Sequence, residues 1–495
     1  QGPGDQFAGG HRCGASDGSG AGSRSFVSQP DAHVQVAGTP RVILIADDLT
    51  GAADSGVTFV KYGARVVVSW ARAVAVKAVS GPAVDSLDAD VVAYSTESRH
   101  CAEAEAVRRV AEIVADLSSI GRARDPVWIY KKIDSTLRGH PGPELAAVMA
   151  ALAGDILASD GTGSGRGARL SAGAPRAQGG AVSRALVAPA LPAQGRVTRS
   201  GVHYVHDVPL AETVFGSEAG ISDVRALIAP AFPEGNVKHL SLATLRQGVD
   251  AAALILMGPP PRSPCVVAAD AETEEDLGAL VELALVTGTR LLCGSAGLAE
   301  ALAARLAGMG VWAPQPAVAQ VQPLGKGVLV VAGSLHPQSL RQIEVLAADG
   351  VPVVRPAVAW FEDTAMGSDA VLAELAAALN GGAAVLTTAG LPPLSVPGMQ
   401  LVSRLAEAVA GLLVAHDLAG LVLTGGDAAI AVGRALGATA LRLRGEVERG
   451  VPWGCLVGGG WEGLPVVTKA GGFGNEHTLL SAVEFLGAAG KGQAI

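Results

Sequence analysis

The segment VILIADDLTGAAD, residues 42–54, decides the fold. Four apolar residues that favour β-structure, 42–45, lead directly into the adjacent carboxylates Asp47 and Asp48, and a helical pattern follows to Val60. This predicts a buried first strand with two acids at its carboxyl end, the edge where open α/β sheets bind ligands. Two like charges side by side need a metal, a cationic ligand or a basic side chain. As an alternative, Asp48 or Thr50 caps the next helix, which explains one residue but not both aspartates.

Length and composition set the class of protein. A chain of 495 residues is too long for a single core, so we expect two α/β domains with mostly parallel sheets and a ligand site in the cleft between them. Hydrophobic residues make up 49% and charged residues 17%, which is enough apolar material for large sheets. The net charge of −9, without a basic stripe, argues against nucleic acid as a partner.

Cysteines and hydropathy indicate the compartment. The 5 cysteines are widely spaced, odd in number and without a CxxC pair, so we expect reduced thiols rather than disulfides or structural zinc. No apolar run approaches the length of about 18 residues that a membrane span needs, and no signal peptide precedes the first strand. The sequence therefore predicts a cytoplasmic protein with no membrane partner, and a homodimer stays open.

Three segments lack apolar periodicity. Residues 1–40 are rich in Gly, Ser, Gln and Asp and predict a flexible extension. Residues 154–184 predict a mobile insertion, because their composition cannot bury enough apolar area to offset the ordering entropy. Proline and glutamine accumulate at 313–326, the predicted linker between a first domain, 41–312, and a second domain, 327–495.

Three predicted strands of the first domain end in polar clusters. The strand at 42–45 is followed by the cluster 47–51, Val91–Tyr94 by 95–99, and Val127–Tyr130 by 131–139. A further strand is predicted at 64–70 and a helix at 101–117. In a parallel sheet, right-handed crossovers bring all three clusters to one edge, where they can form a single pocket.

The charges of that pocket indicate its ligand. Four basic residues suit an anionic substrate with a carboxylate or phosphate: Arg99, Lys131, Lys132 and Arg138. Three carboxylates remain to bind hydroxyls, hold Mg²⁺ or take a proton: Asp47, Asp48 and Asp134. Each charge alone is explained equally well as a solvated loop residue, but three clusters at strand ends are harder to dismiss.

The stretch APALPAQGRVTRSGVHYVHDVPLAET, from residue 188, adds Arg196, His203 and Tyr204. His203 and His206 are spaced like metal ligands, yet no third ligand lies nearby in the sequence. We therefore expect hairpin residues near the substrate and no metal site built by the protein.

The second domain contains the same kind of turn three times. Small-residue turns follow predicted strands in AGSLHPQS at 332, TGGDAA at 424 and TKAGGFGNE at 468. Glycines let backbone amides approach phosphate, and a helix N-terminus adds a favourable field. No Walker A motif and no complete GxGxxG is present, so each turn alone is weak evidence for a nucleotide site. Their recurrence favours a nucleotide.

Together these motifs resemble the four-carbon acid sugar kinases. The resemblance covers about residues 42–488 and rests on several motifs in the same order: IADDLTGAAD at 45, STESR at 95, YKKIDSTLRGHPGPEL at 130, the stretch from 188, GSAGLAEAL at 294 and the three turns above. It implies an ATP-dependent, Mg²⁺-requiring kinase that phosphorylates the terminal (4-) hydroxyl of threonate, erythronate or a 3-oxo-tetronate. The first domain would bind the sugar acid and the second ATP.

The resemblance also implies roles for matched residues. ATP would contact Ser334, Gly425, Gly426, Asp427, Ala428 and Gly472. The sugar acid would contact Thr50, Arg99, Lys131, Lys132, Ser135 and Arg138, with the catalytic carboxylate among Asp47, Asp48 and Asp134. The long insertion at 154–184 and a short region after Phe215 depart from the family pattern, which leaves the substrate preference open.

Two other classes of function are compatible with parts of this pattern. A dinucleotide-dependent oxidoreductase acting on a small hydroxy acid would use the glycine turns for pyrophosphate, but a full fingerprint and an acidic ribose ligand are missing. A non-catalytic sensor of acidic metabolites could be built on the same two lobes. Binding of ATP with Mg²⁺, but not of NAD(P), together with phosphate transfer, separates the kinase from both.

Overall fold

The computed structural model describes residues 35–37, 41–70, 86–117, 127–153, 184–232, 237–257, 264–312, 321, 323–393 and 395–489. Most of the predicted extension, the insertion from 154 to 183 and residues 313–320 of the predicted linker lie outside these ranges.

The first half of the chain forms a parallel sheet in the order β11-β12-β7-β13-β6-β2-β5-β3. Its strands are β2 (Val42–Ala46), β3 (Val66–Ser69), β5 (Val91–Ser95), β6 (Trp128–Lys132), β7 (Arg184–Ala188), β11 (Val237–Leu240), β12 (Cys265–Ala269) and β13 (Leu291–Gly294). All five residues of β2 are buried, as a strand covered on both faces requires. The strands predicted from the sequence in this half are confirmed.

The second half continues the same sheet. Strands β20 (Pro465–Lys469), β17 (Gly420–Thr424), β14 (Val328–Ala332), β16 (Ala383–Thr387) and β15 (Val353–Val354) run parallel. The antiparallel strands β18 (Ala440–Glu448) and β19 (Val451–Val457) connect β3 to β20, giving one 15-stranded sheet. The α/β class and the mostly parallel pairing are confirmed. The division into domains at 313–326 stays a prediction, because the two halves share a sheet.

Small elements lie outside the large sheet. A two-stranded sheet pairs β1 (Gln35–Ala37) with β4 (Ser86–Asp88), and a three-stranded sheet contains β8 (Arg196–Arg199), β9 (Val202–Val205) and β10 (Val208–Pro209). The 3₁₀ turns are η2 (Pro192–Gln194), η3 (Leu210–Glu212) and η4 (Ala229–Ala231). The hairpin predicted around His203 is therefore present as β8 and β9.

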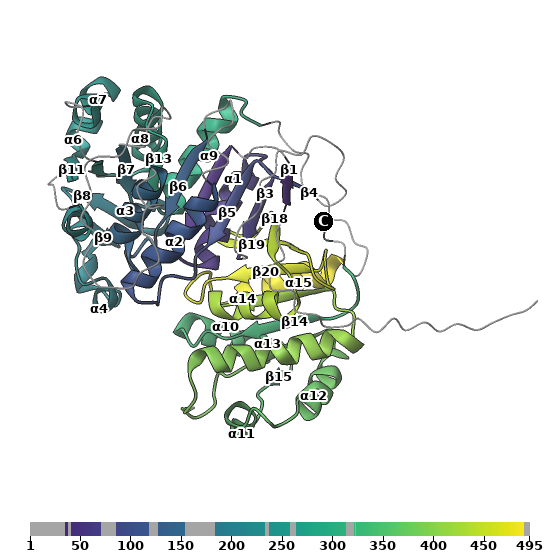
Figure 1. Ribbon diagram of the computed structural model, residues 1–495. Helices are drawn as coiled ribbons and strands as arrows, with labels where there is room; N and C mark the ends of the chain where they lie inside the picture. The colour runs from purple at the N-terminus through teal and green to yellow at the C-terminus, as the bar shows by residue number, and fades with distance from the viewer. Residues whose placement is uncertain are drawn as a thin grey trace, which may run out of the picture.

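Helices cover both faces of the sheet (Figure 1). One continuous core lies under α1 (Leu49–Lys61), α7 (Val249–Met257), α8 (Glu274–Thr287), α9 (Ala296–Gly308), α11 (Val358–Glu362), α12 (Asp369–Leu379), α13 (Gly398–Ala415) and α14 (Gly426–Ala435). On the other face, one core lies under α2 (Glu103–Leu117), α3 (Pro141–Leu152) and α5 (Val224–Ile228), and another under α10 (Pro337–Ala348) and α15 (Thr478–Ala489). The short helices α4 (Gly216–Ala219) and α6 (Leu242–Leu245) complete the set.

Helix α13 is the one described helix that is long and apolar enough to cross a membrane. Half of its apolar window is buried inside the protein, and its residues belong to the core beneath α14. The core helix of a water-soluble protein has the same character, so α13 is weak evidence for a span.

Sheet twist decides how the two halves face each other. Through β18 and β19, the strands of the second half run opposite to those of the first, so their carboxyl ends would diverge in a flat sheet. Six strand-to-strand steps separate β2 from β17, and at roughly 20–25° a step the twist accumulates on the order of 120–150°. Figure 1 shows the strands of the two halves running in clearly different directions. Twist of this size can turn the two carboxyl edges toward a common site.

Candidate active site

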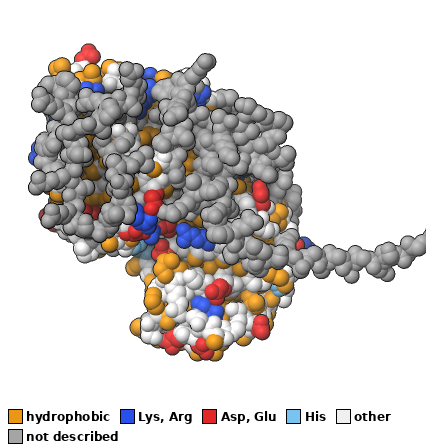
Figure 2. Space-filling view, viewed as in Figure 1, with side chains coloured by type: hydrophobic (Ala, Val, Ile, Leu, Met, Phe, Trp, Pro, Cys, Tyr) orange, Lys and Arg blue, Asp and Glu red, His pale blue; other side chains and the backbone are white. Residues whose placement is uncertain are grey.

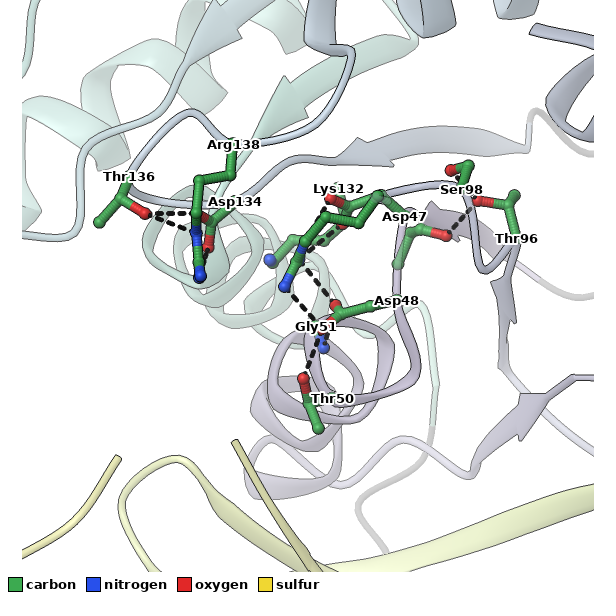
Figure 3. A network of polar contacts seen from close by, with 12 residues as sticks. Asp47, Asp48, Thr50, Gly51, Thr96, Ser98, Lys132, Asp134, Thr136 and Arg138 are labelled. Carbon is green, nitrogen blue, oxygen red and sulfur yellow. Dashed lines mark hydrogen bonds and ion pairs between the residues drawn. The ribbon is translucent and has the colours of Figure 1, made fainter. Parts of the chain in front are cut away.

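The ends of β2, β5 and β6 meet at one edge, as the crossover argument predicted. In the parallel register, Ala46 lies opposite Ser95 on one side and Lys132 on the other. Figure 3 shows the polar side chains that follow these strands near the first turn of α1. The structure therefore brings the three polar clusters together.

Arg99 is the partner that balances the adjacent aspartates. Its Nε and Nη2 donate to Asp47 at 2.7 and 2.8 Å, and its Nη1 and Nη2 donate to Asp48 at 2.7 and 2.8 Å. Burial of Asp47 opposes its ionisation, but the charges of Arg99 and the nearby lysines hold its pKa below the usual range. Arg99 is thus the counter-ion of the two aspartates, and its contact with a sugar acid stays a prediction.

Asp48 also caps α1. Its Oδ1 accepts a hydrogen bond from the backbone N–H of Gly51 at 2.8 Å, and its Oδ2 accepts one from the Thr50 hydroxyl at 2.6 Å. The capping alternative raised from the sequence is therefore correct for Asp48. Asp47 makes no such bond and is 2% exposed, so capping does not account for the pair.

Lys131 and Lys132 point to opposite faces of β6, as neighbours in a strand do. Lys131 is fully buried, forms an ion pair with Glu144 at 2.7 Å and donates to the Lys132 carbonyl at 2.8 Å. Lys132 Nζ lies 3.0 Å from where a Cβ on Gly51 would be, and it has no hydrogen-bond partner among the described residues. Lys132 is therefore available to bind an anion, whereas Lys131 stabilises the end of β6 on the opposite face of the strand.

The loop after β6 is held by its own charges. Arg138 Nε donates to Asp134 at 2.6 Å, and the Thr136 hydroxyl donates to the same carboxylate. Burial disfavours the charge of Asp134, but Arg99 and Arg138 outweigh it and hold its pKa well below the usual range. Leu137 adopts a φ of 59°, which a bulky residue rarely does. Backbone held in such a conformation is typical of functional loops.

The β8–β9 hairpin supports the same loop. Arg196 Nη1 donates to the Ser135 hydroxyl at 2.7 Å, and His203 Nε2 lies 2.8 Å from the Ser135 carbonyl. Burial lowers the pKa of His203 to about 4, which keeps its ring neutral. Tyr204 stacks beneath Arg199, with 5.5 Å between the guanidinium and the ring centre. No cluster of three or more His, Cys, Asp or Glu suited to a metal occurs among the described residues.

The turns of the second half converge beyond β14, β17 and β20. Gly425, at the N-cap of α14, has a φ of 99°, and its backbone lies beside Ser334. A Cβ on Gly471 would lie 2.2 Å from Ser334 Oγ, and one on Gly472 would lie 3.1 Å from His336 Nε2. Ala428 packs against Gly333 and Asp427 is exposed in the first turn of α14. Such close backbones before a helix N-terminus suit an anionic ligand.

A buried lysine, Lys469, shapes the last of these turns. It is 1% exposed, and its Nζ donates to the carbonyls of Ala470, Gly471 and Phe473 at 2.8, 3.1 and 3.2 Å. No carboxylate pairs with it among the described residues, and burial lowers its pKa to about 8. Although TKAGGFGNE was recognised as a turn, the lysine in it was not predicted to matter.

The two half-sites touch at the start of α14. A Cβ on Gly426 would lie 3.7 Å from Thr50 Cγ2 and 3.8 Å from Asp48 Oδ2. Glu97 lies in the same region with a φ of 52°, and burial, followed by the charges of Asp48 and Asp427, raises its pKa to about 7. Figure 2 shows acidic and basic side chains side by side near the junction of the two parts of this face.

Asp54 and Glu97 are candidate site residues that the sequence analysis missed, although both stand inside quoted motifs. A signal for Asp54 was present: Thr50, Asp54, Thr58 and Lys61 form a polar stripe with helical spacing on α1. Glu97 stands in the polar cluster 95–99 that was predicted to reach the pocket, but its interaction with Asp427 depends on the packing of α14 against the first half.

Comparisons with known proteins agree with this two-part site. Residues 42–302 match the family model described as a sugar-binding N-terminal domain, and residues 329–479 match the one described as a nucleotide-binding C-terminal domain. The chain is 34% identical to a D-threonate kinase of Bordetella bronchiseptica, covering 90% of this chain and 98% of that protein. It is 29% identical to a D-erythronate kinase of Heliobacterium modesticaldum, covering 90% and 97%.

A solved structure supports the fold independently. A Haemophilus influenzae protein aligns over 90% of this chain and 99% of its own, with a TM-score of 0.63 at 20% identity. The relatives are phosphotransferases with an alcohol acceptor, and the sequence matches run through both halves of the chain. The protein therefore belongs to the family of four-carbon acid sugar kinases.

Proposed function

We propose that this protein transfers the γ-phosphoryl group of ATP to the terminal (4-) hydroxyl of a four-carbon sugar acid: threonate, erythronate or a 3-oxo-tetronate. The observation that carries the proposal is the contact between the two half-sites. A Cβ on Gly426 would lie within 4 Å of both Asp48 and Thr50, so a phosphate held by the glycine turn would lie beside carboxylate and hydroxyl groups of the first half. The family relationship supports the same reaction.

Each half has a separate task. Ser334, the N-terminus of α14 and the loop held by Lys469 would bind the phosphates of ATP through backbone amides and one buried positive charge. Lys132 would bind the carboxylate of the acid, because its ammonium group lacks a partner among the described residues. In-line phosphoryl transfer depends mainly on positioning and neutralisation of charge.

Asp48 is the carboxylate best placed to orient the attacking hydroxyl. Its Oδ2 lies 3.8 Å from where a Cβ on Gly426 would be, and two hydrogen bonds from Arg99 fix the orientation of the carboxylate. A transition state with little bond formation needs such orientation more than a strong base. Lys131 and Arg99 would act indirectly, by fixing the strand ends and the pair of aspartates.

Mg²⁺ fits this site through its carboxylates. Kinases usually hold the ion with one or two carboxylates and the phosphates themselves, so a cluster of three protein ligands is not required. Asp427 in the first turn of α14 and Asp48 at the start of α1 are the residues that would hold it, and the ion would neutralise charge on the phosphates.

A coupled assay of ADP release tests the proposal. D- and L-threonate, D- and L-erythronate and the 3-oxo-tetronates are compared with ATP and Mg²⁺, and phosphorus NMR locates the phosphate on the product. We expect one acid to be phosphorylated on its terminal oxygen and erythritol to be a poor substrate, since unpaired buried cations cost roughly 2–5 kcal/mol. No ADP release with any of these acids would overturn the proposal. Turnover of erythritol as fast as erythronate would refute the role of the carboxylate.

A further inference from the structure

A cavity of about 190 Å³ opens beside α1, away from the glycine turns. Its walls come from α1, α9, η2 and the hairpin of β18 and β19, and they include Asp54, Gln194, Glu300, Glu446 and Arg449. None of these residues has a task in the reaction as described above. The polar lining distinguishes the cavity from a packing defect, which is normally apolar.

Most charges around the cavity are already satisfied. Lys61 forms an ion pair with Glu300, and Arg449 Nη2 reaches the same carboxylate at 3.1 Å. Glu446 accepts a hydrogen bond from the backbone N–H of Gly450 at 3.0 Å. These contacts tie the hairpin to α1 and α9, and they leave Asp54 as the exception.

Asp54 faces the cavity without a protein partner. Its Oδ1 lies 3.5 Å from where a Cβ on Gly450 would be, and it accepts no hydrogen bond from the described residues. Burial is the largest influence on this carboxyl and raises its pKa to about 6. A partly buried carboxylate without a donor is still destabilising, so this position favours a ligand that supplies one.

Two donors near Asp54 lack acceptors as well. Lys132 Nζ lies against Gly51, one helical turn before Asp54 on α1, and has no partner among the described residues. Arg196 Nε is buried without a hydrogen bond, while Nη1 of the same side chain donates to Gln194 in the cavity wall at 2.7 Å. One free acceptor and two free donors complement a molecule that carries a hydroxyl and a carboxylate.

We propose that Asp54 determines substrate specificity, accepting a hydrogen bond from a hydroxyl on the carbon chain of the sugar acid while Lys132 and Arg196 bind its carboxylate. This rests on the proposed kinase activity and goes beyond it by naming the residue that recognises a chain hydroxyl. Asp54 lines the cavity, which provides room for part of the substrate. Lys132 and Arg196 lie outside the cavity lining, and their charges act on the Asp54 carboxyl. A site built to bind a hydroxyl discriminates strongly against the analogue that lacks it, because its buried polar group is then left unpaired.

The test pairs a protein variant with substrate analogues. The kcat/KM of the parent and of Asp54→Ala is measured for the preferred acid and for its 2-deoxy and 3-deoxy analogues. In the parent, removal of one hydroxyl should lower kcat/KM by roughly 100-fold or more. In Asp54→Ala, the same removal should lower it by less than about 5-fold, because the partner of that hydroxyl is gone. The KM for ATP should stay within a few fold of the parent.

Glu300→Gln is the matched control, since it neutralises another carboxylate in the same cavity wall. It should keep the discrimination of the parent against the deoxy analogues. Should Asp54→Ala fail to fold, Asp54→Leu keeps a similar volume without an acceptor, and its discrimination should fall in the same direction. Equal discrimination by the parent and by a folded variant would overturn the assignment of Asp54. A parent that phosphorylates no four-carbon acid would instead overturn the proposed function.

Discussion

The two halves of the site bind charge in different ways. The first half uses side chains: Arg99 bridges Asp47 and Asp48, and Arg138 pairs with Asp134. The second half uses backbone: glycines at 425, 426, 471 and 472 bring the chain close, and a buried cation, Lys469, donates to carbonyls. In the first half, removal of one charged partner should therefore lower stability. In the second half, a side chain added at a glycine should lower activity.

The sharpest way to break the first half is Arg99→Ala. It leaves two adjacent carboxylates without their counter-ion, and removing one partner of a buried pair costs roughly 3–5 kcal/mol. We expect the free energy of unfolding in urea to fall by about that amount. Arg108→Ala, on the surface of α2 with its side chain 52% exposed, should change the free energy of unfolding little. Equal losses in both variants would show that Arg99 is an ordinary surface charge.

Gly426→Val is the corresponding way to break the second half. The new side chain would meet Thr50 and Asp48 and fill the space that the proposed reaction assigns to the phosphoryl group. We expect kcat to fall by roughly 100-fold, about 2.7 kcal/mol, while the sugar acid still binds in a titration. The control is Gly278→Val in α8, where an added Cβ meets nothing within 4 Å. Loss of sugar-acid binding together with activity would point to misfolding instead.

The pH dependence of stability tests the environment of Glu97, which lies where the two halves meet. Its pKa is raised from 4.5 to about 7 in the folded protein, so the stability present below about pH 4.5 is lost as the pH rises through about 7. Glu97→Gln removes this loss. The variant should be more stable than the parent by roughly 2–3 kcal/mol at about pH 8, with a gain that shrinks toward about pH 4.5.

The exposed residue Glu212 provides the control for Glu97, because Glu212→Gln should change the free energy of unfolding little at any pH. Urea titrations at several pH values measure both variants. A gain for Glu97→Gln that does not depend on pH would show that the carboxylate charge is not its cause.

The sequence predicted the first half better than the second. Apolar runs ending in polar clusters predicted the strands at Val42, Val91 and Val127, and the crossover rule then predicted that Asp47, Arg99 and Asp134 lie on one edge. These features are local or follow from topology, so they can be read without coordinates.

The sequence could not predict which side chains contact one another. Lys131 and Lys132 are identical in type, yet one is buried against Glu144 and the other lacks a partner among the described residues. The interaction of Glu97 with Asp427 and the approach of Gly426 to Asp48 both join the two halves of the chain. They depend on the twist of one continuous sheet, where the sequence predicted a separate sheet for each domain. Contacts between distant segments are set by packing of the whole sheet, which residue types alone do not reveal.

The smallest expected effect distinguishes the lone cation of the second half from the paired cations of the first. Lys469→Met fills similar space but removes the charge and three hydrogen bonds to carbonyls. Replacing a buried charge by an apolar group often leaves stability unchanged or raised, so the fold should survive. We expect the KM for ATP to rise roughly tenfold, about 1.4 kcal/mol, with an unchanged KM for the sugar acid. The exposed Lys326→Met is the control, and a parent-like KM for ATP in Lys469→Met would confine this lysine to loop structure.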